Sequence, residues 1–138
     1  MNTTPYPLNI LLIDQDPDML DALASLADGL GHFATESAHP DRAVTLLKSV
    51  AFDVLITGPA IGRVSGPAFI AQALVVRPAL GAVMVATTPR ARDLAATSAV
   101  PLAQPLTMSG MRRAIDEALR RRGMRGQDKQ GSDCPEAI

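Results

Sequence analysis

Short apolar runs alternate with helical patterns along most of this chain. Consecutive apolar residues recur at 9–13, 53–57 and 82–86, a pattern typical of parallel strands that are covered on both faces. Two weaker candidates, 32–37 and 100–103, complete a set of five. Pro101 interrupts the last of them, and a proline is tolerated there only at a sheet edge or at the start of a strand.

Helical patterns fill the segments between these strands. Asp16 and Pro17 form a cap and first turn, and Gly31 follows the last apolar position of that helix. Further helices are predicted at 40–50, at 65–77 behind Ser65, and, short and weak, at 90–99. A closing helix begins after Thr107 and is expected to end at Gly123.

Five alternating strand and helix units predict an α/β fold with a doubly wound, five-stranded parallel sheet of the flavodoxin-like kind. We expect one domain at 9–122, an N-terminal extension at 1–8, and a polar, disordered tail at 123–138.

Composition narrows the setting of this domain. Net charge is −1, which favours neither a nucleic-acid nor a membrane partner. Eight acids face two bases in residues 1–60, whereas eleven bases face six acids afterwards; we interpret this as solvated surface. Cys134 is the single cysteine, no apolar run approaches the ~18 residues of a membrane span, and the first residues lack a signal-peptide pattern. The expected location is the cytoplasm.

The order of these segments resembles the receiver domains of two-component response regulators. The segments that carry the resemblance are ILLIDQDPDML, GHFATESA, FDVLITGPAIGRVSG, RPALGAVMVATT and PLAQPLTMSGMRRAI. Together they span roughly residues 9–121. The resemblance implies a domain in which an aspartate receives a phosphoryl group from a histidine kinase beside a bound Mg²⁺. A neighbouring lysine would neutralise the developing charge.

This sequence departs from that chemistry at the acidic positions. The acidic pair falls on Asp14 and Gln15, so one carboxylate is replaced by an amide, and we interpret nearby Asp16 as a helix cap in preference to a metal ligand. The phosphoacceptor position falls on Gly58. We expect Gly58 to adopt a backbone conformation that an aspartate would not.

The remaining functional positions are substituted as well. The Ser/Thr position falls on Ala86, or on Thr87 if the register is one residue out, and the lysine position falls on Gln104. Gln104 precedes Pro105, and the resemblance implies a cis bond there. The aromatic switch position falls on Pro101, and the fourth helix is expected to be shortened.

No other residue is placed to rescue the reaction. The chain has two lysines, Lys48 and Lys129, and neither is predicted to reach the strand ends. Asp53 lies at the start of its strand, and Thr57 is expected to point away from the position of Gly58.

Other chemical motifs have simpler interpretations. His32 and His39 lack partner ligands at metal spacing, and Gly62 and Gly66 are interpreted as turn residues. The basic run 120–122 is interpreted as a favourable cationic helix end, with an acidic partner as the alternative.

The sequence therefore predicts a pseudo-receiver that is not an enzyme and has no metal or cofactor. It would bind a histidine kinase, a phosphotransfer protein or another receiver independently of phosphorylation, as a monomer or weak homodimer. Three alternatives stay open: a small-ligand sensor that uses the vacated strand-end pocket, an enzyme with divergent chemistry, and a residual receiver modified at Asp14 or Asp16.

Overall fold

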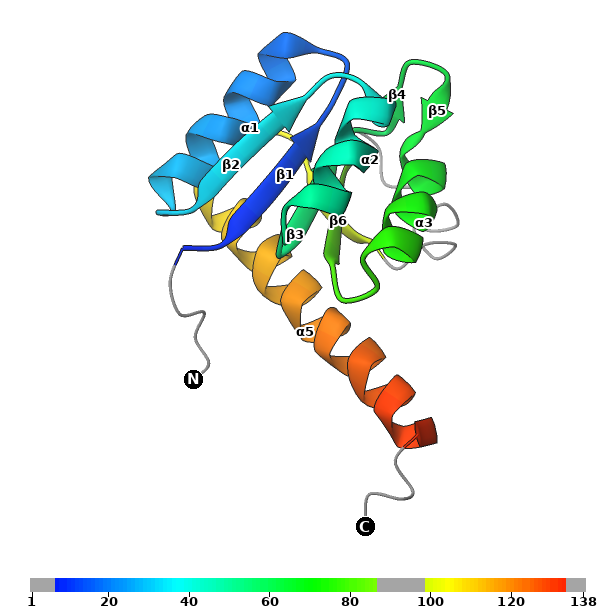
Figure 1. Cartoon of the computed structure of the whole chain (residues 1–138). Helices are drawn as coiled ribbons and strands as arrows, with labels where there is room; N and C mark the ends of the chain where they lie inside the picture. The colour runs from blue at the N-terminus through cyan, green and yellow to red at the C-terminus, as the bar shows by residue number, and fades with distance from the viewer. Residues whose placement is uncertain (1–6, 87–98, 134–138) are drawn as a thin grey trace.

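Five parallel strands form the centre of the molecule in a computed structural model that describes residues 7–86 and 99–133. The strands lie in the order β2-β1-β3-β6-β7 (Figure 1). Their bounds are Asn9–Ile13 for β1, Phe33–Ser37 for β2, Val54–Thr57 for β3, Gly81–Ala86 for β6 and Val100–Ala103 for β7. This is the predicted α/β fold with a five-stranded parallel sheet.

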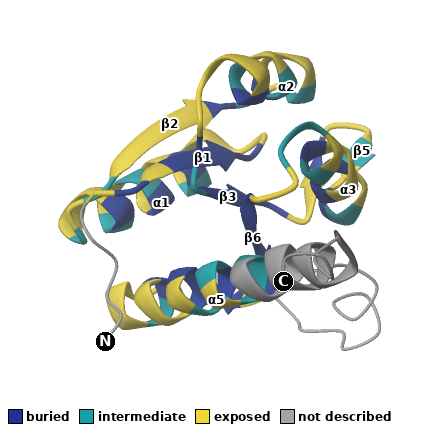
Figure 2. Ribbon diagram, turned by 60° about the horizontal axis from the view of Figure 1, so that its bottom comes forward, coloured by how far each residue is buried: buried dark blue, intermediate teal, exposed yellow. Residues whose placement is uncertain are grey.

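Helices cover both faces of the sheet. Helices α1 (Pro17–Gly29) and α5 (Met108–Asp133) pack on one face, and α2 (Pro40–Ser49) and α3 (Gly66–Val76) pack on the other. The buried side of each helix faces the sheet in Figure 2. Because β1 and β3 are covered on both faces, their successive side chains enter two separate apolar cores, with Leu12 in one and Leu11 in the other.

Local signals that the sequence provides set the helix starts. The Asp16 carboxylate accepts a hydrogen bond from the Asp18 amide, and the Ser65 hydroxyl accepts one from Ala68. Gly31 follows α1 with a φ of 88°, a conformation that favours glycine. These caps confirm the predicted beginnings of α1 and α3.

Pro101 is accommodated because β7 is an edge strand. It lies opposite Met84 of β6, which is the only neighbouring strand of β7 within the described sheet. A proline lacks the amide that an interior strand would need on one side. Of the two placements that the sequence allowed for Pro101, the structure has the sheet edge.

The structure differs from the sequence prediction at three places. Helix α5 continues past Gly123 to Asp133, where a disordered tail was expected; glycines weaken a helix but, unlike proline, do not block it, and the next proline is Pro135. Leu8, assigned to the extension, is buried in the core. A small antiparallel hairpin, β4 (Ala60–Ile61) and β5 (Val64–Ser65), was not anticipated. The shortened fourth helix falls outside the described residues.

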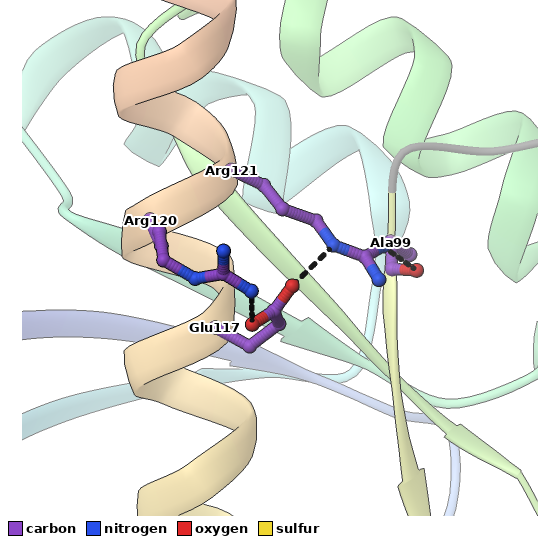
Figure 3. A network of polar contacts seen from close by, with 4 residues as sticks. All are labelled: Ala99, Glu117, Arg120 and Arg121. Atoms are coloured by element: carbon purple, nitrogen blue, oxygen red, sulfur yellow. Dashed lines mark hydrogen bonds and ion pairs between the residues drawn. The ribbon is translucent and has the colours of Figure 1, made fainter.

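Arginines 120–122 lie within α5, so their interpretation as a cationic helix end is wrong. Arg120 and Arg121 both bond to Glu117, and Arg121 also donates to the Ala99 carbonyl at 3.4 Å (Figure 3). Arg122 donates to the Asp53 carbonyl at 3.1 Å. These bonds connect α5 to the amino ends of β3 and β7.

Candidate functional site at the carboxyl ends of the strands

The positions that correspond to the receiver site gather at one edge of the sheet. Asp14 follows β1, Gly58 follows β3, Ala86 ends β6, and Gln104 follows β7. The parallel ladders that join these strands place their carboxyl ends side by side, which is where ligands and reacting groups bind in open α/β sheets. Asp53, as expected, lies at the opposite end of β3.

Asp14 is the ionisable side chain at the centre of this edge. It is one of three buried polar residues among those described, with 5% of its surface exposed. Its Oδ1 accepts a hydrogen bond from the Asp16 amide at 2.9 Å. The carboxylate is thereby fixed between β1 and the first turn of α1.

The Asp14 carboxylate occupies the space where a side chain at position 58 would begin. A Cβ built on Gly58 would lie 2.8 Å from the Asp14 Cγ, with one carboxylate oxygen closer still. The backbone of Gly58 is held by its amide, which donates to the Ile13 carbonyl at 3.0 Å. Position 58 therefore has no room for a side chain while Asp14 keeps this conformation.

The reason for glycine at position 58 differs from the one predicted. The glycines with positive φ among the described residues are Gly31 and Gly62, and Gly58 is not one of them. Its backbone conformation is open to other residues, so the prediction of a special conformation is wrong. The constraint is steric, and Asp14 imposes it.

Burial raises the pKa of the Asp14 carboxyl above its ordinary value. The charge of Asp16 adds to this rise, while hydrogen bonds from the Asp16 and Gln15 amides oppose it. A second carboxylate at position 58 would add like charge at very short range. The Asp14 carboxylate therefore disfavours an aspartate at position 58 both by electrostatic repulsion and by steric clash.

Gln15 connects the end of β1 to the β4–β5 hairpin. Its Oε1 accepts a hydrogen bond from the Gly62 amide at 2.8 Å. Gly62 has a φ of 64° in the turn, so its interpretation as a turn residue is confirmed. The side-chain amide of Gln15 therefore holds the turn of the β4–β5 hairpin through this hydrogen bond.

Gly66, interpreted as a turn residue from the sequence, is the first residue of α3. A Cβ there would lie 2.5 Å from the Gly58 carbonyl oxygen and 2.9 Å from the Met84 sulfur. The Gly66 amide also donates to the Pro59 carbonyl at 2.8 Å. Glycine is required because α3 starts in direct contact with the Gly58–Pro59 backbone.

Other predicted site residues have defined places. The Gln104–Pro105 bond is cis, as predicted. Thr57 is fully buried and donates to the Gly58 carbonyl at 3.0 Å. Lys48 is exposed on α2. Thr87, the alternative hydroxyl, lies outside the described residues.

Two of the groups considered as metal ligands, Asp16 and His32, make hydrogen bonds within the protein. Asp16 caps α1, and the His32 Nδ1 accepts a bond from the Leu8 amide at 3.1 Å. Burial lowers the pKa of His32. Over the residues that the structure describes, no three His, Cys, Asp or Glu side chains are grouped so as to hold a metal ion.

Sequence reasoning identified the positions but missed the contacts between them. The sequence alone did not predict that Asp14 packs against Gly58 or that the Gly62 amide donates to Gln15. The glycines at 58 and 66 were the available signal, since a glycine beside a strand end often marks close backbone approach.

The fold is that of response-regulator receiver domains. The chain matches the signal receiver domain of an HD domain-containing protein from Pseudomonas fluorescens Pf-5 with a TM-score of 0.75 and 20% identity, over 92% of this chain and 97% of that one. A CheY-like receiver domain protein from Methanospirillum hungatei JF-1 matches with a TM-score of 0.72 and 18% identity, over 86% and 98%.

A longer protein shares the same fold in one part. NtrX from Brucella abortus matches with a TM-score of 0.75 and 17% identity, over 89% of this chain but 29% of that chain. No protein-family model matches this sequence, and no curated protein matches it. Among the described residues, none of the helices is both long and apolar enough to cross a membrane.

Proposed function

We propose that this protein is a receiver-like module of a two-component phosphorelay that binds a protein partner without accepting a phosphoryl group. The receiver fold supports the signalling context. The observation that carries the proposal is the contact between the Asp14 carboxylate and Gly58, since it fills the place where the resemblance puts the phosphoacceptor.

The chemistry of phosphoryl transfer supports the same conclusion. A carboxylate nucleophile requires cations that neutralise the charge gathering on the phosphoryl oxygens. By the resemblance, position 58 would supply the nucleophile and position 104 the lysine, and here they are glycine and glutamine. Asp14, the remaining buried carboxylate, bonds to a backbone amide and has a raised pKa.

The proposal extends to partners and setting. The partner would be a histidine kinase, a phosphotransfer protein or another receiver, in the cytoplasm, bound by a monomer or a weak homodimer. We propose no enzymatic activity, cofactor or metal, and neither a nucleic-acid nor a membrane partner. The net charge of −1 agrees with this choice.

The small-ligand alternative loses its main support. It depended on free space at the strand end, and the Asp14 carboxylate occupies the space beside Gly58. We therefore do not develop it as a second function.

Incubation with acetyl phosphate and Mg²⁺, read by intact-protein mass, tests the proposal. A receiver that retains its aspartate serves as the positive control. We expect no phosphoryl adduct on this protein under conditions that label the control. An adduct that disappears in Asp14→Asn or Asp16→Asn would overturn the proposal and identify the residual receiver as correct.

A further inference from the structure

The outward side of α3 differs from that of the other helices. Its inward residues Phe69, Ile70 and Ala73 are buried in the core beneath it. Its outward residues, which we call the α3 outer face, are exposed: Ala68, Ala71, Gln72 and Val75. Val75 has 81% of its surface exposed, the largest fraction among the exposed large apolar residues of the described chain.

A surface helix normally carries charged residues on the side that faces water. Helix α1 exposes Asp18, Asp21 and Asp28, and the outward residues of α2 and α5 are also charged. Of the four helices that the structure describes, α3 alone has no charged residue within its bounds. An outer side that is mostly apolar and has no charged residue is typical of a surface that contacts another molecule.

Both ends of α3 carry positive charge. Arg63 is exposed in the hairpin turn before the helix, and Arg77 follows its last residue. Arg77 donates to the carbonyls of Leu47 and Val50, at 2.7 and 3.5 Å. Both acceptors are carbonyls at the end of α2, so these bonds do not pair Arg77 with a carboxylate. From residue 54 to residue 86 the sequence contains no acidic residue.

The two arginines favour an acidic partner over a second copy of this chain as the molecule that binds the α3 outer face. A second copy packed antiparallel on α3 would place Arg63 of one molecule near Arg77 of the other, and a parallel arrangement would pair each arginine with itself. Both put like charges together, which disfavours self-association. A partner with carboxylates at the same two places would be attracted instead.

We propose that the α3 outer face docks a helix of another protein that has an apolar stripe with acidic residues at both ends. The 11 residues of α3 correspond to about 16 Å, so the partner's carboxylates would lie about three to four turns apart. This inference rests on the proposed protein-binding function and assigns it a surface.

The docking surface is connected rigidly to the substituted strand end. Helix α3 begins at Gly66, whose amide bonds to the Pro59 carbonyl and whose missing Cβ lets it touch the Gly58 carbonyl. The contact of Gly66 with the Gly58 carbonyl therefore places the start of α3 beside the strand end, where the Asp14 carboxylate excludes a side chain at position 58. A rigid, preformed face lowers the cost of ordering on binding.

A synthetic helical peptide with leucines along one side and glutamates in its first and last turns is the probe. We expect saturable NMR shifts of α3 amides on titration into the ¹⁵N-labelled protein. A matched peptide with lysines in place of the glutamates should bind about tenfold more weakly. Absence of binding by the glutamate peptide, equal binding of both peptides, or shifts that leave α3, Arg63 and Arg77 unaffected would overturn the proposal.

Two protein variants complete the test. Val75→Asp should weaken binding of the glutamate peptide about tenfold, whereas Ala22→Asp, which adds the same charge to an exposed site on α1, should leave it unchanged. Arg63→Glu should improve binding of the lysine peptide. Sedimentation that shows a dimer abolished by Val75→Asp would overturn the proposal in favour of a second copy.

The outcomes separate this inference from the function on which it rests. Failure of the peptide test with no phosphoryl adduct would remove the α3 surface and leave the protein-binding proposal standing. A phosphoryl adduct would remove the latter, whatever the peptide does.

Discussion

Gly58→Ala is the substitution most sensitive to the contact between positions 14 and 58. The new Cβ would lie 2.8 Å from the Asp14 Cγ, well inside the ~3.5–4.0 Å at which carbon atoms pack. Asp14 must then move and lose its 2.9 Å bond to the Asp16 amide. Such a bond contributes about 1 kcal/mol, and overpacking costs about 1–3 kcal/mol.

We therefore expect the free energy of unfolding to fall by about 2–4 kcal/mol, measured by urea denaturation. In an Asp14→Ala background the space is empty, and alanine at position 58 should cost little, because the φ of Gly58 is not positive. The double-mutant cycle should give a coupling energy of about 2 kcal/mol.

Asp28→Ala supplies the control for this cycle. Asp28 is an exposed aspartate near the opposite end of α1, so its removal should be additive with Gly58→Ala within about 0.5 kcal/mol. A coupling between positions 14 and 58 no larger than that of the control would refute the steric explanation for glycine at 58.

Three further substitutions test the surrounding contacts. Asp14→Asn should stabilise the protein near neutral pH, because the folded-state pKa of Asp14 is raised. The protonated Asp14 carboxyl contributes fully to the free energy of unfolding below the ordinary carboxyl pKa, and this contribution is lost as the pH rises through the raised pKa. The advantage of Asn in denaturation experiments should thus vanish in acid, and a pH-independent difference would contradict this. Gly66→Ala should lower the unfolding free energy by about 1–3 kcal/mol through its clash with the Gly58 carbonyl, and an unchanged denaturation midpoint would argue against that contact. Arg122→Gln removes a partly exposed 3.7 Å ion pair with Asp53 and the hydrogen bond to the Asp53 carbonyl. It should lower the unfolding free energy by about 1–2 kcal/mol, and a larger loss would mean that this part of α5 stabilises the fold more than its exposure indicates.

The sequence was sufficient for the architecture because each element carried its own signal. Apolar runs gave β1, β3 and β6, and the cap at Asp16 together with Gly31 defined α1. Pro101 limited β7 to a sheet edge or a strand start, and the structure has the edge. Periodicity and capping act locally, so these features could be predicted without knowledge of tertiary contacts.

The contacts of the site could not be predicted in the same way. Which side chain fills the space beside Gly58 depends on the rotamer of Asp14, and that rotamer depends on a bond to the Asp16 amide. Such choices arise only when the strands are paired and α1 is docked. The length of α5 was missed for another reason, because helix propensity around Gly123 and Gly126 is weak and does not fix a boundary.

Gly58 and Pro59 at the end of a central strand now have a physical explanation. Gly58 accommodates the Asp14 carboxylate on one side and the start of α3 on the other, and the Pro59 carbonyl accepts the first amide of that helix. The end of β3 therefore packs against the first residue of α3 and positions that helix.

The most direct test of the central claim is an NMR titration of ¹⁵N-labelled protein with Mg²⁺ and then with beryllofluoride, which mimics an acyl phosphate on aspartate. We predict no saturable shifts at the amides of Asp14, Gly58, Ala86 and Gln104. Saturable shifts at these strand ends would contradict the account, because they would show that the substituted site still binds the activating groups of a receiver.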